Sequence, residues 1–196
     1  MSLLSGCWDK LELEEQAYVV VLGVDISKKL ENGVNITFQI ANPQVGSTDK
    51  GNAPNEPPSD TLTFTASDII AAKELANSVV TRKLSFAHLN TLVIGEELAK
   101  SNRLNHVIGS ALRDPEMRRE INIIVSKEKA QKFIHANKPK LETRPHKYYA
   151  FMQQRWRDTG HVPYATLNRY MQRIQGELFL AIYGTAERAS SEYKKN

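Results

Sequence analysis

The chain has 196 residues, of which 41% are hydrophobic and 24% are charged, and these values are typical of one folded globular domain. A single cysteine excludes an internal disulfide and makes a cysteine-based zinc site untenable. The formal net charge of +4 hides an asymmetry, because residues 1–128 carry 13 basic and 17 acidic side chains whereas residues 129–173 carry 10 and 2. Such a basic block is typical either of a solvated helical surface or of a surface that attracts nucleic acid, anionic lipid or an acidic partner.

The first third of the chain predicts strands. The valine-rich run Tyr18–Asp25 predicts a buried strand, and the alternating apolar and polar residues 34–40 predict a strand with one buried face. The turn signal Asn32-Gly33 between them predicts a β-hairpin. Residues 43–60, which hold four prolines and two glycines, predict a flexible loop, and the alternation at Thr61–Thr65 predicts a third strand.

The rest of the chain mixes helices with strands. Ser67 is expected to cap a helix, with Asp68 near its positive end, and the apolar face of that helix is predicted at Ile69, Ala72, Ala76, Val79 and Val80. Further strands are expected at Asn90–Gly95, Ile121–Val125 and Glu177–Tyr183, and further helices at 103–112, 127–136, 147–157 and 166–174.

This order of elements predicts an α+β fold, a mixed β-sheet that begins with a β-hairpin and has helices packed against it. We expect a single α+β domain over residues 18–184, with the flexible loop 43–60 inside it. Residues 1–17 are interpreted as a lipobox remnant and N-terminal segment, and residues 185–196 as the start of a linker.

The segment Leu4-Ser5-Gly6-Cys7 has the form of a bacterial lipobox. Small residues before the cysteine let a peptidase reach the backbone, and the thiol then carries a diacylglycerol. The alternative interpretation is a free thiol in an N-terminal segment without defined structure. We favour lipid attachment at Cys7, because the pattern lies beside the N-terminus and there is no second cysteine.

The segment Arg113-Asp114-Pro115-Glu116 has a structural interpretation and a functional one. Asp114 can cap a new turn, Pro115 suits its first position, and Glu116 meets its positive end. The functional alternative is a charged corner that a partner recognises. The structural interpretation is favoured, since proline prevents Asp114 from continuing the preceding helix.

Asp25 and His88 are the candidates for catalysis. His88 precedes a predicted strand, and no serine, cysteine or carboxylate is tied to it by a recognised spacing, which favours a hydrogen-bonded structural histidine. Asp25 ends the first strand, where a turn-capping role is favoured over catalysis. The sequence contains no phosphate-binding glycine loop, no nucleophile elbow and no HExxH zinc helix, so no metal or cofactor is expected.

An ordered series of short motifs resembles the Ger(x)C family, the C-subunit lipoproteins of nutrient germinant receptors in spore-forming bacteria. The family usually has isoleucine in place of Val24, but the other residues agree. The motifs are Cys7-Trp8-Asp9, Glu12-Leu13, Leu22-Gly23-Val24-Asp25, Ile40-Ala41-Asn42-Pro43, Phe86-Ala87-His88-Leu89, Ile94-Gly95-Glu96-Glu97-Leu98-Ala99 and Leu112-Arg113-Asp114-Pro115-Glu116.

The resemblance implies a non-enzymatic role in germination. It implies a lipid on Cys7, a location on the outer face of the spore inner membrane, and partnership with integral membrane A- and B-type subunits. It covers the N-terminal domain of such subunits, so further C-terminal domains are expected to follow. No cofactor and no nucleic acid are implied, and direct contact with the nutrient is left open.

Three other functions compete with this interpretation. The first is a solute-binding lipoprotein that holds a small nutrient in a cleft. The second is a hydrolase that uses His88 and Asp25. The third is a cytosolic nucleic-acid binder, which the sequence pI of about 9.1 suggests and which predicts binding that weakens steeply with salt.

Overall fold

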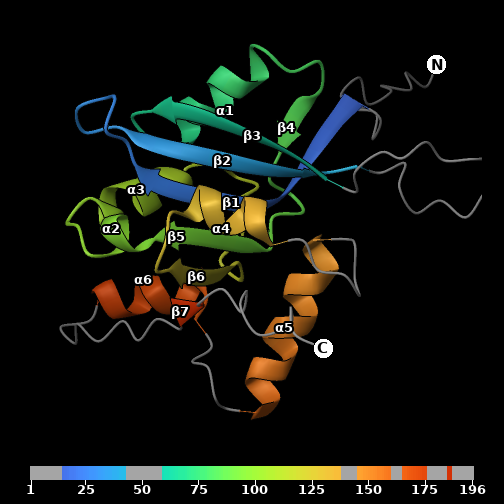
Figure 1. The fold of residues 1–196 in the computed structure, drawn as a ribbon, viewed down its shortest axis with the longest axis vertical. Helices are drawn as coiled ribbons and strands as arrows, with labels where there is room; N and C mark the ends of the chain where they lie inside the picture. Colours follow the sequence, from blue (N-terminus) through green and yellow to red (C-terminus); the bar gives the residue numbers. More distant parts are fainter. Residues whose placement is uncertain (1–14, 43–58, 138–144, 160–164, 176–184, 187–196) are drawn as a thin grey trace, which may run out of the picture.

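The computed structural model describes residues 15–42, 59–137, 145–159, 165–175 and 185–186, whose strands form one seven-stranded mixed sheet (Figure 1). The strand order is β3-β2-β1-β5-β6-β7, and β4 pairs with the beginning of β1. The strands are β1 (Gln16–Ile26), β2 (Val34–Ala41), β3 (Ser59–Ala66), β4 (Lys83–Ser85), β5 (Thr91–Gly95), β6 (Asn122–Ser126) and β7 (Thr185–Ala186). The helices are α1 (Ile69–Asn77), α2 (Glu96–Ala99), α3 (Leu104–Ala111), α4 (Ala130–Ala136), α5 (Pro145–Thr159) and α6 (Leu167–Gln175).

The predicted hairpin of β1 and β2 is confirmed, and the Asn-Gly signal lies in its connection. The Ser27 N–H donates to the Gly33 carbonyl at 3.0 Å, and the Gly33 N–H donates to the Leu30 carbonyl at 2.9 Å. Asn32 has a φ of 55°, a left-handed conformation that asparagine tolerates better than most residues. A Cβ on Gly33 would lie 2.5 Å from that of Leu30, so the tight connection requires glycine there.

The remaining pairs of the sheet, apart from β2 with β3, are parallel. Parallel neighbours need crossover connections, and the helices between β3 and β7 lie within them. The predicted α+β class with a mixed sheet is thereby confirmed. The three-residue strand β4 was not predicted, because so short a segment carries no periodicity.

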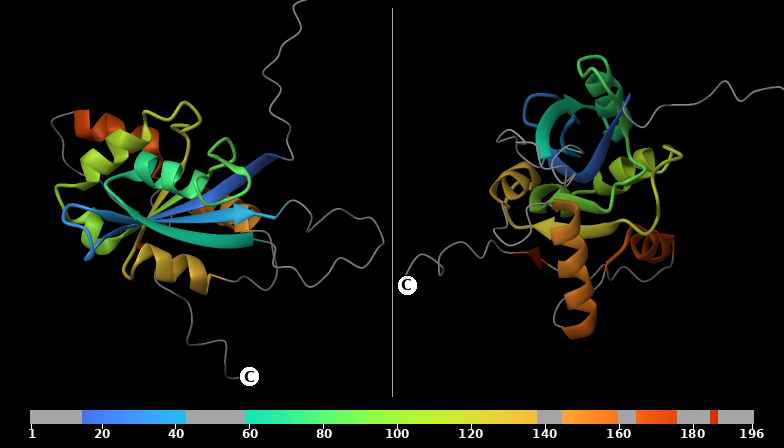
Figure 2. Two further views of the ribbon diagram at one scale, coloured as in Figure 1. Left: turned by 90° about the horizontal axis from the view of Figure 1, so that it is seen from above. Right: turned by 90° about the vertical axis from the view of Figure 1, so that its right-hand side faces the viewer.

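Two apolar clusters lie on opposite faces of the sheet (Figure 2). The larger cluster joins one face of the sheet to α1, α2, α3 and α6, and its largest fully buried side chains include Phe38, Phe86, Leu22 and Ile36. The smaller cluster joins the other face to α4 and α5 through Val21, Val93, Ile124, Ala130, Ile134 and Tyr149. The sheet is therefore covered on both faces.

Two details of α1 correct the prediction. Its N-cap is Asp68 rather than Ser67, because the Asp68 carboxylate accepts the Ala71 N–H at 2.9 Å. Val79, predicted on the buried face, is 69% exposed because the helix ends at Asn77.

Several other predictions fall partly or wholly outside the described residues. The predicted strand Glu177–Tyr183 lies outside them, as does the predicted loop apart from residues 59–60, which belong to β3. Thr185–Ala186, expected to begin a linker, pair with β6 as β7.

Candidate functional site

Asp25 stands at the carboxyl end of β1, and its carboxylate holds the first turn of α4. Oδ1 accepts the backbone N–H of Ala130 at 2.7 Å, and Oδ2 accepts that of Gln131 at 3.0 Å. Burial raises the pKa of Asp25, while the two backbone hydrogen bonds and the nearby Lys129 act in the opposite direction. Both oxygens of Asp25 accept backbone N–H groups of α4, whereas the prediction placed its partner in the adjacent turn.

Two glycines leave the space that this arrangement needs. A Cβ on Gly23 would lie 2.6 Å from the Ile134 Cδ1 and 3.3 Å from the Thr37 Cβ, so the absence of a side chain lets α4 approach β1. A Cβ on Gly95 would collide with the Asp25 Oδ1. Gly95 therefore allows the carboxylate to reach across from β1 to α4.

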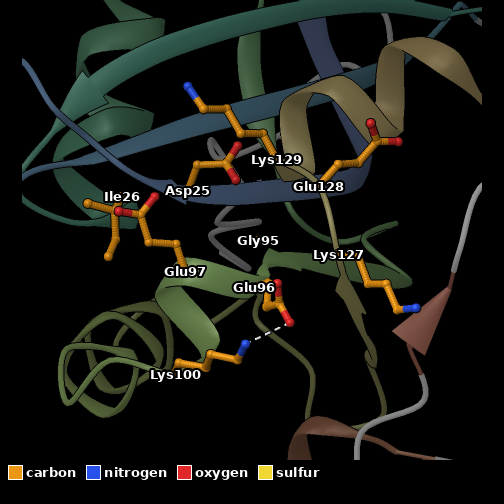
Figure 3. A pocket seen from close by; sticks show the side chains of 9 residues that line it. All are labelled: Asp25, Ile26, Gly95, Glu96, Glu97, Lys100, Lys127, Glu128 and Lys129. Atoms are coloured by element: carbon orange, nitrogen blue, oxygen red, sulfur yellow. Dashed lines mark hydrogen bonds and ion pairs between the residues drawn. The ribbon is translucent and has the colours of Figure 1, made fainter.

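A pocket of about 260 Å³ opens beside Asp25 at the carboxyl ends of β1, β5 and β6 (Figure 3). Sheets with parallel strands commonly bind ligands at such strand ends, which makes it a candidate binding site. Its cations do not converge, because Lys100 pairs with Glu96 at 2.8 Å while Lys127 and Lys129 point away from each other (Figure 3). The charged lining residues are Asp25, Glu96, Glu97, Lys100, Lys127, Glu128 and Lys129.

Asp114 and Glu116 meet Lys73 of α1 in an ion-pair cluster that is largely buried. The Lys73 Nζ lies 2.6 Å from the Asp114 Oδ2 and 3.1 Å from the Glu116 Oε2. The side chains of Lys73 and Asp114 are 10% and 7% exposed, and that of Glu116 is 36% exposed. The Asp114 Oδ1 also accepts the Glu116 N–H at 2.9 Å, so the turn that Asp114 was predicted to cap is present.

The same cluster fixes β4. The Glu116 Oε2 accepts the Phe86 N–H at 2.7 Å, and its Oε1 accepts the Ser85 hydroxyl at 3.1 Å. Burial alone would raise the pKa of Glu116, but the hydrogen bonds from Phe86, Lys73 and Ser85 and the charge of Lys73 together lower it. The Lys73 Nζ also lies 4.4 Å from the centre of the Phe86 ring. One lysine and two carboxylates thus join α1, β4 and the turn that follows α3.

Sequence reasoning missed Lys73 and Ser85. A signal for Lys73 was available, because it falls on the i, i+4, i+7 spacing of Ile69 and Ala76 and so on the buried face of the predicted helix. A lysine on such a face requires a buried anionic partner. Ser85 gave no signal of its own.

His88 and Arg113 belong neither to the contacts of Asp25 with α4 nor to the Lys73 ion-pair cluster. His88 is exposed, and its ring lies against that of Tyr18 with 4.4 Å between the ring centres. Tyr18 is near the start of β1 and Asp25 near its end, roughly 23 Å apart at the usual rise per residue. The structure therefore does not bring the His88 and Asp25 of the hydrolase hypothesis together. Arg113 is exposed beside the buried Asp114.

The basic block of residues 129–173 does not form one surface. Within its described part, α4 and α5 lie on one face of the sheet and α6 lies on the other (Figure 2). Lys132 of α4 pairs with Glu128 at 3.3 Å. The fold therefore divides the positive charge that the sequence concentrates.

The described residues include no helix with the length and apolar character needed to cross a bilayer. They also include no group of His, Cys, Asp and Glu side chains that could hold a metal ion. Cys7 lies outside the described residues.

The fold is an α+β domain in which two charged clusters join elements that are distant in the chain, and sequence comparison gives its family. The chain belongs to the spore germination protein N-terminal domain family, whose model matches residues 9–183. The resemblance to a family of spore germination proteins is thereby confirmed.

Two relatives come from Bacillus subtilis (strain 168). The chain is 34% identical to spore germination protein KC over 135 residues. This match covers 67% of this chain and 33% of that protein. It is 27% identical to the putative spore germination protein YfkR over 138 residues. This match covers 69% of this chain and 35% of that protein. The chain spans about a third of the length of these relatives. No solved structure matches it.

Proposed function

We propose that this chain is the N-terminal domain of a lipid-anchored, non-enzymatic subunit of a spore nutrient germinant receptor. In this role it is a scaffold or signalling partner of integral membrane A- and B-type subunits, held at the outer face of the spore inner membrane by a lipid on Cys7. The observation that carries the proposal is the match of residues 9–183 to the spore germination family.

The roles of the charged residues support a scaffold. Asp25 holds α4, and Asp114 and Glu116 hold α1 and β4, so these acids are engaged in fixing the fold. His88 has no carboxylate or nucleophile among its described contacts. A domain whose charged groups are used in this way offers a rigid surface to a partner rather than a reaction centre.

The role of the lipid is tested by Cys7→Ala in the full-length protein in spores. A diacylglyceryl group supplies two chains, which suffices for stable anchoring where one chain gives only marginal binding. We expect the variant protein to be lost from the membrane fraction and nutrient-triggered germination to slow, as measured by immunoblot and by the fall in optical density.

Ser5→Ala is the matched control, because it keeps a small residue before the cysteine and should leave both readouts unchanged. A Cys7→Ala protein that stays in the membrane fraction contradicts the proposed anchor. A variant that leaves the membrane fraction while germination is normal contradicts the proposed role of the anchor in germination.

The second candidate function is direct binding of a small nutrient, which the pocket beside Asp25 favours. A ligand at 100 times its dissociation constant would add about 2.7 kcal/mol to the free energy of unfolding. For a scaffold we expect no change in melting temperature with amino acids, sugars or nucleosides. A shift that disappears in the Lys129→Ala variant would instead favour the solute-binding role.

A further inference from the structure

The strand β3 is an edge strand of the sheet that the described residues form. It pairs with β2 along its whole length, from Ser59 to Ala66, and no described strand lies on its other side. Only Ala66 is buried, and the other residues of the strand are partly or fully exposed. Figure 1 shows β3 beside β2, on the side of β2 that faces away from β1.

The backbone of β3 presents its threonines to the side away from β2. Ser27 stands opposite Gly33, one position beyond the Ile26–Val34 pair, and the bond from the Ser27 N–H to the Gly33 carbonyl marks this position as a hydrogen-bonded pair of the β1–β2 ladder. Because such pairs alternate along an antiparallel ladder, Ile36 directs its backbone groups to β3, where it stands opposite Phe64. The alternate residues of β3 therefore direct their N–H and C=O groups outward, and these are Ser59, Thr61, Thr63 and Thr65.

The hydrogen bonds of Asp60 agree with this assignment. The Thr61 N–H donates to the Asp60 Oδ1 at 2.7 Å, so this outward N–H is satisfied by a side chain rather than by a strand. The outward groups of Thr63 and Thr65 have no partner strand within the described part of the chain.

The edge lacks the features by which proteins usually prevent edge pairing. Soluble sheets protect an open edge with lysines, prolines, bulges or inward-pointing charges. β3 contains no lysine and no proline, its pairing with β2 is regular, and Asp60 is its only charged residue. An eight-residue edge of this kind is suited to pairing with another strand.

The sequence of β3 identifies the strand that fits it. We infer that β3 pairs in antiparallel orientation with β3 of a second copy of this chain, about a two-fold axis at Thr63. In this register Thr63 faces Thr63, Thr61 faces Thr65, and Leu62 faces Phe64. Threonine pairs and aromatic–aliphatic pairs are favourable cross-strand neighbours, and no like charges oppose each other.

The two-fold axis is consistent with the two layers of helices. An axis perpendicular to the sheet keeps each face continuous across the junction, so α1 of both copies lies on one side and α4 of both copies on the other. Pairing of one short strand from each copy buries little surface and gives a weak interface in solution. Tethering of both copies to one membrane, which rests on the proposed function, would raise their effective concentration.

A disulfide that depends on register tests this pairing. In a Cys7→Ser background, the Thr63→Cys chain is oxidised under mild conditions and examined by non-reducing electrophoresis. Facing residues of a hydrogen-bonded pair have Cα atoms about 5.5 Å apart, which is within the range of a disulfide. The Thr61→Cys chain is the control, because the two Thr61 residues would be offset by four positions, roughly 13 Å.

We expect a disulfide-linked dimer from Thr63→Cys and none from Thr61→Cys. Mixing Thr61→Cys with Thr65→Cys should restore the dimer, because these positions face each other in the same register. Circular dichroism shows whether loss of the Thr63 contacts with Thr37, at 3.0 Å, and Gln131, at 3.2 Å, disturbs the fold. No dimer from folded Thr63→Cys, equal yields at 63 and 61, or no dimer from the mixture overturns the proposal.

Discussion

Lys73→Met is expected to lower the free energy of unfolding by about 3–5 kcal/mol, because it leaves the buried Asp114 carboxylate without its cation. Glu116 then lies close to a second carboxylate that has also lost its ion pair with Lys73. Methionine keeps most of the length of the side chain and its contact with the Phe86 ring, so the loss reports on charge more than on packing. Urea denaturation followed by circular dichroism measures the change.

Lys100→Met is the matched control. Lys100 forms an exposed i, i+4 pair with Glu96, and the Lys100 side chain is 73% exposed, so water screens the pair and its loss should change stability little. Equal losses of unfolding free energy in the two variants would show that burial does not make the Lys73 cluster more stabilising than an exposed ion pair. An unchanged Lys73→Met variant would show that the cluster contributes no stability.

The cluster also gives a pH signature. The pKa of Glu116 is lowered below its ordinary value of 4.5 in the folded state. Its contribution to stability is therefore present above that value and is lost as the pH falls through the folded pKa. Lys73→Met removes one cause of the lowered pKa. The difference in free energy of unfolding between the wild type and the variant should therefore become smaller in acid.

The sequence predicted the elements whose side-chain pattern is strong. Tyr18–Asp25 and residues 34–40 form paired strands as expected, because a buried run and a period of two both survive in the folded sheet. The start of α1 was misplaced by one residue because Ser67 and Asp68 are both good caps, and only the hydrogen bond to Ala71 distinguishes them.

The candidate site was predicted only in part, because its contacts join distant parts of the chain. Asp25, Asp114 and Glu116 were predicted as structural residues, but their partners lie far away in sequence. Lys73 is 41 residues from Asp114, and the amide of Ala130 is 105 residues from Asp25. Periodicity describes neighbours three or four residues apart and contains no information on such pairs.

The contacts give a physical reason for several motifs of the family resemblance. The motif that ends in Asp25 meets the motif that contains Gly95, and both meet the start of α4. The motif that begins with Phe86 meets the motif that ends in Glu116. These four motifs therefore contact each other in two pairs inside the fold, although sequence reasoning treated each motif as a separate feature.

Gly95→Ala is expected to destabilise the fold by on the order of 3 kcal/mol, because the added methyl collides with the Asp25 carboxylate. The backbone itself would accept alanine, since Gly95 has φ −65° and ψ 143°. The carboxylate has no room to yield without giving up its hydrogen bonds to Ala130 and Gln131. The variant should therefore loosen the first turn of α4 as well as lower the melting temperature.

Gly109→Ala is the matched control, because Gly109 is exposed in α3 and nothing lies within 4 Å of an added Cβ. It should be neutral or raise stability by about 0.5–1 kcal/mol, since alanine is the better helix former. A loss as large as that of Gly95→Ala would contradict the steric explanation.

A double-mutant cycle separates the collision from other effects of the methyl group. Asp25→Ala removes the carboxylate, and the next atom that an alanine Cβ at position 95 would meet is the Ala130 backbone nitrogen at 3.5 Å, an ordinary contact. Adding Gly95→Ala to Asp25→Ala should therefore change the free energy of unfolding little. The sum of the losses in the two single variants should then exceed the loss in the double variant. Additive losses would mean that Gly95 and Asp25 act independently, and that glycine at position 95 does not serve to admit the carboxylate that holds α4.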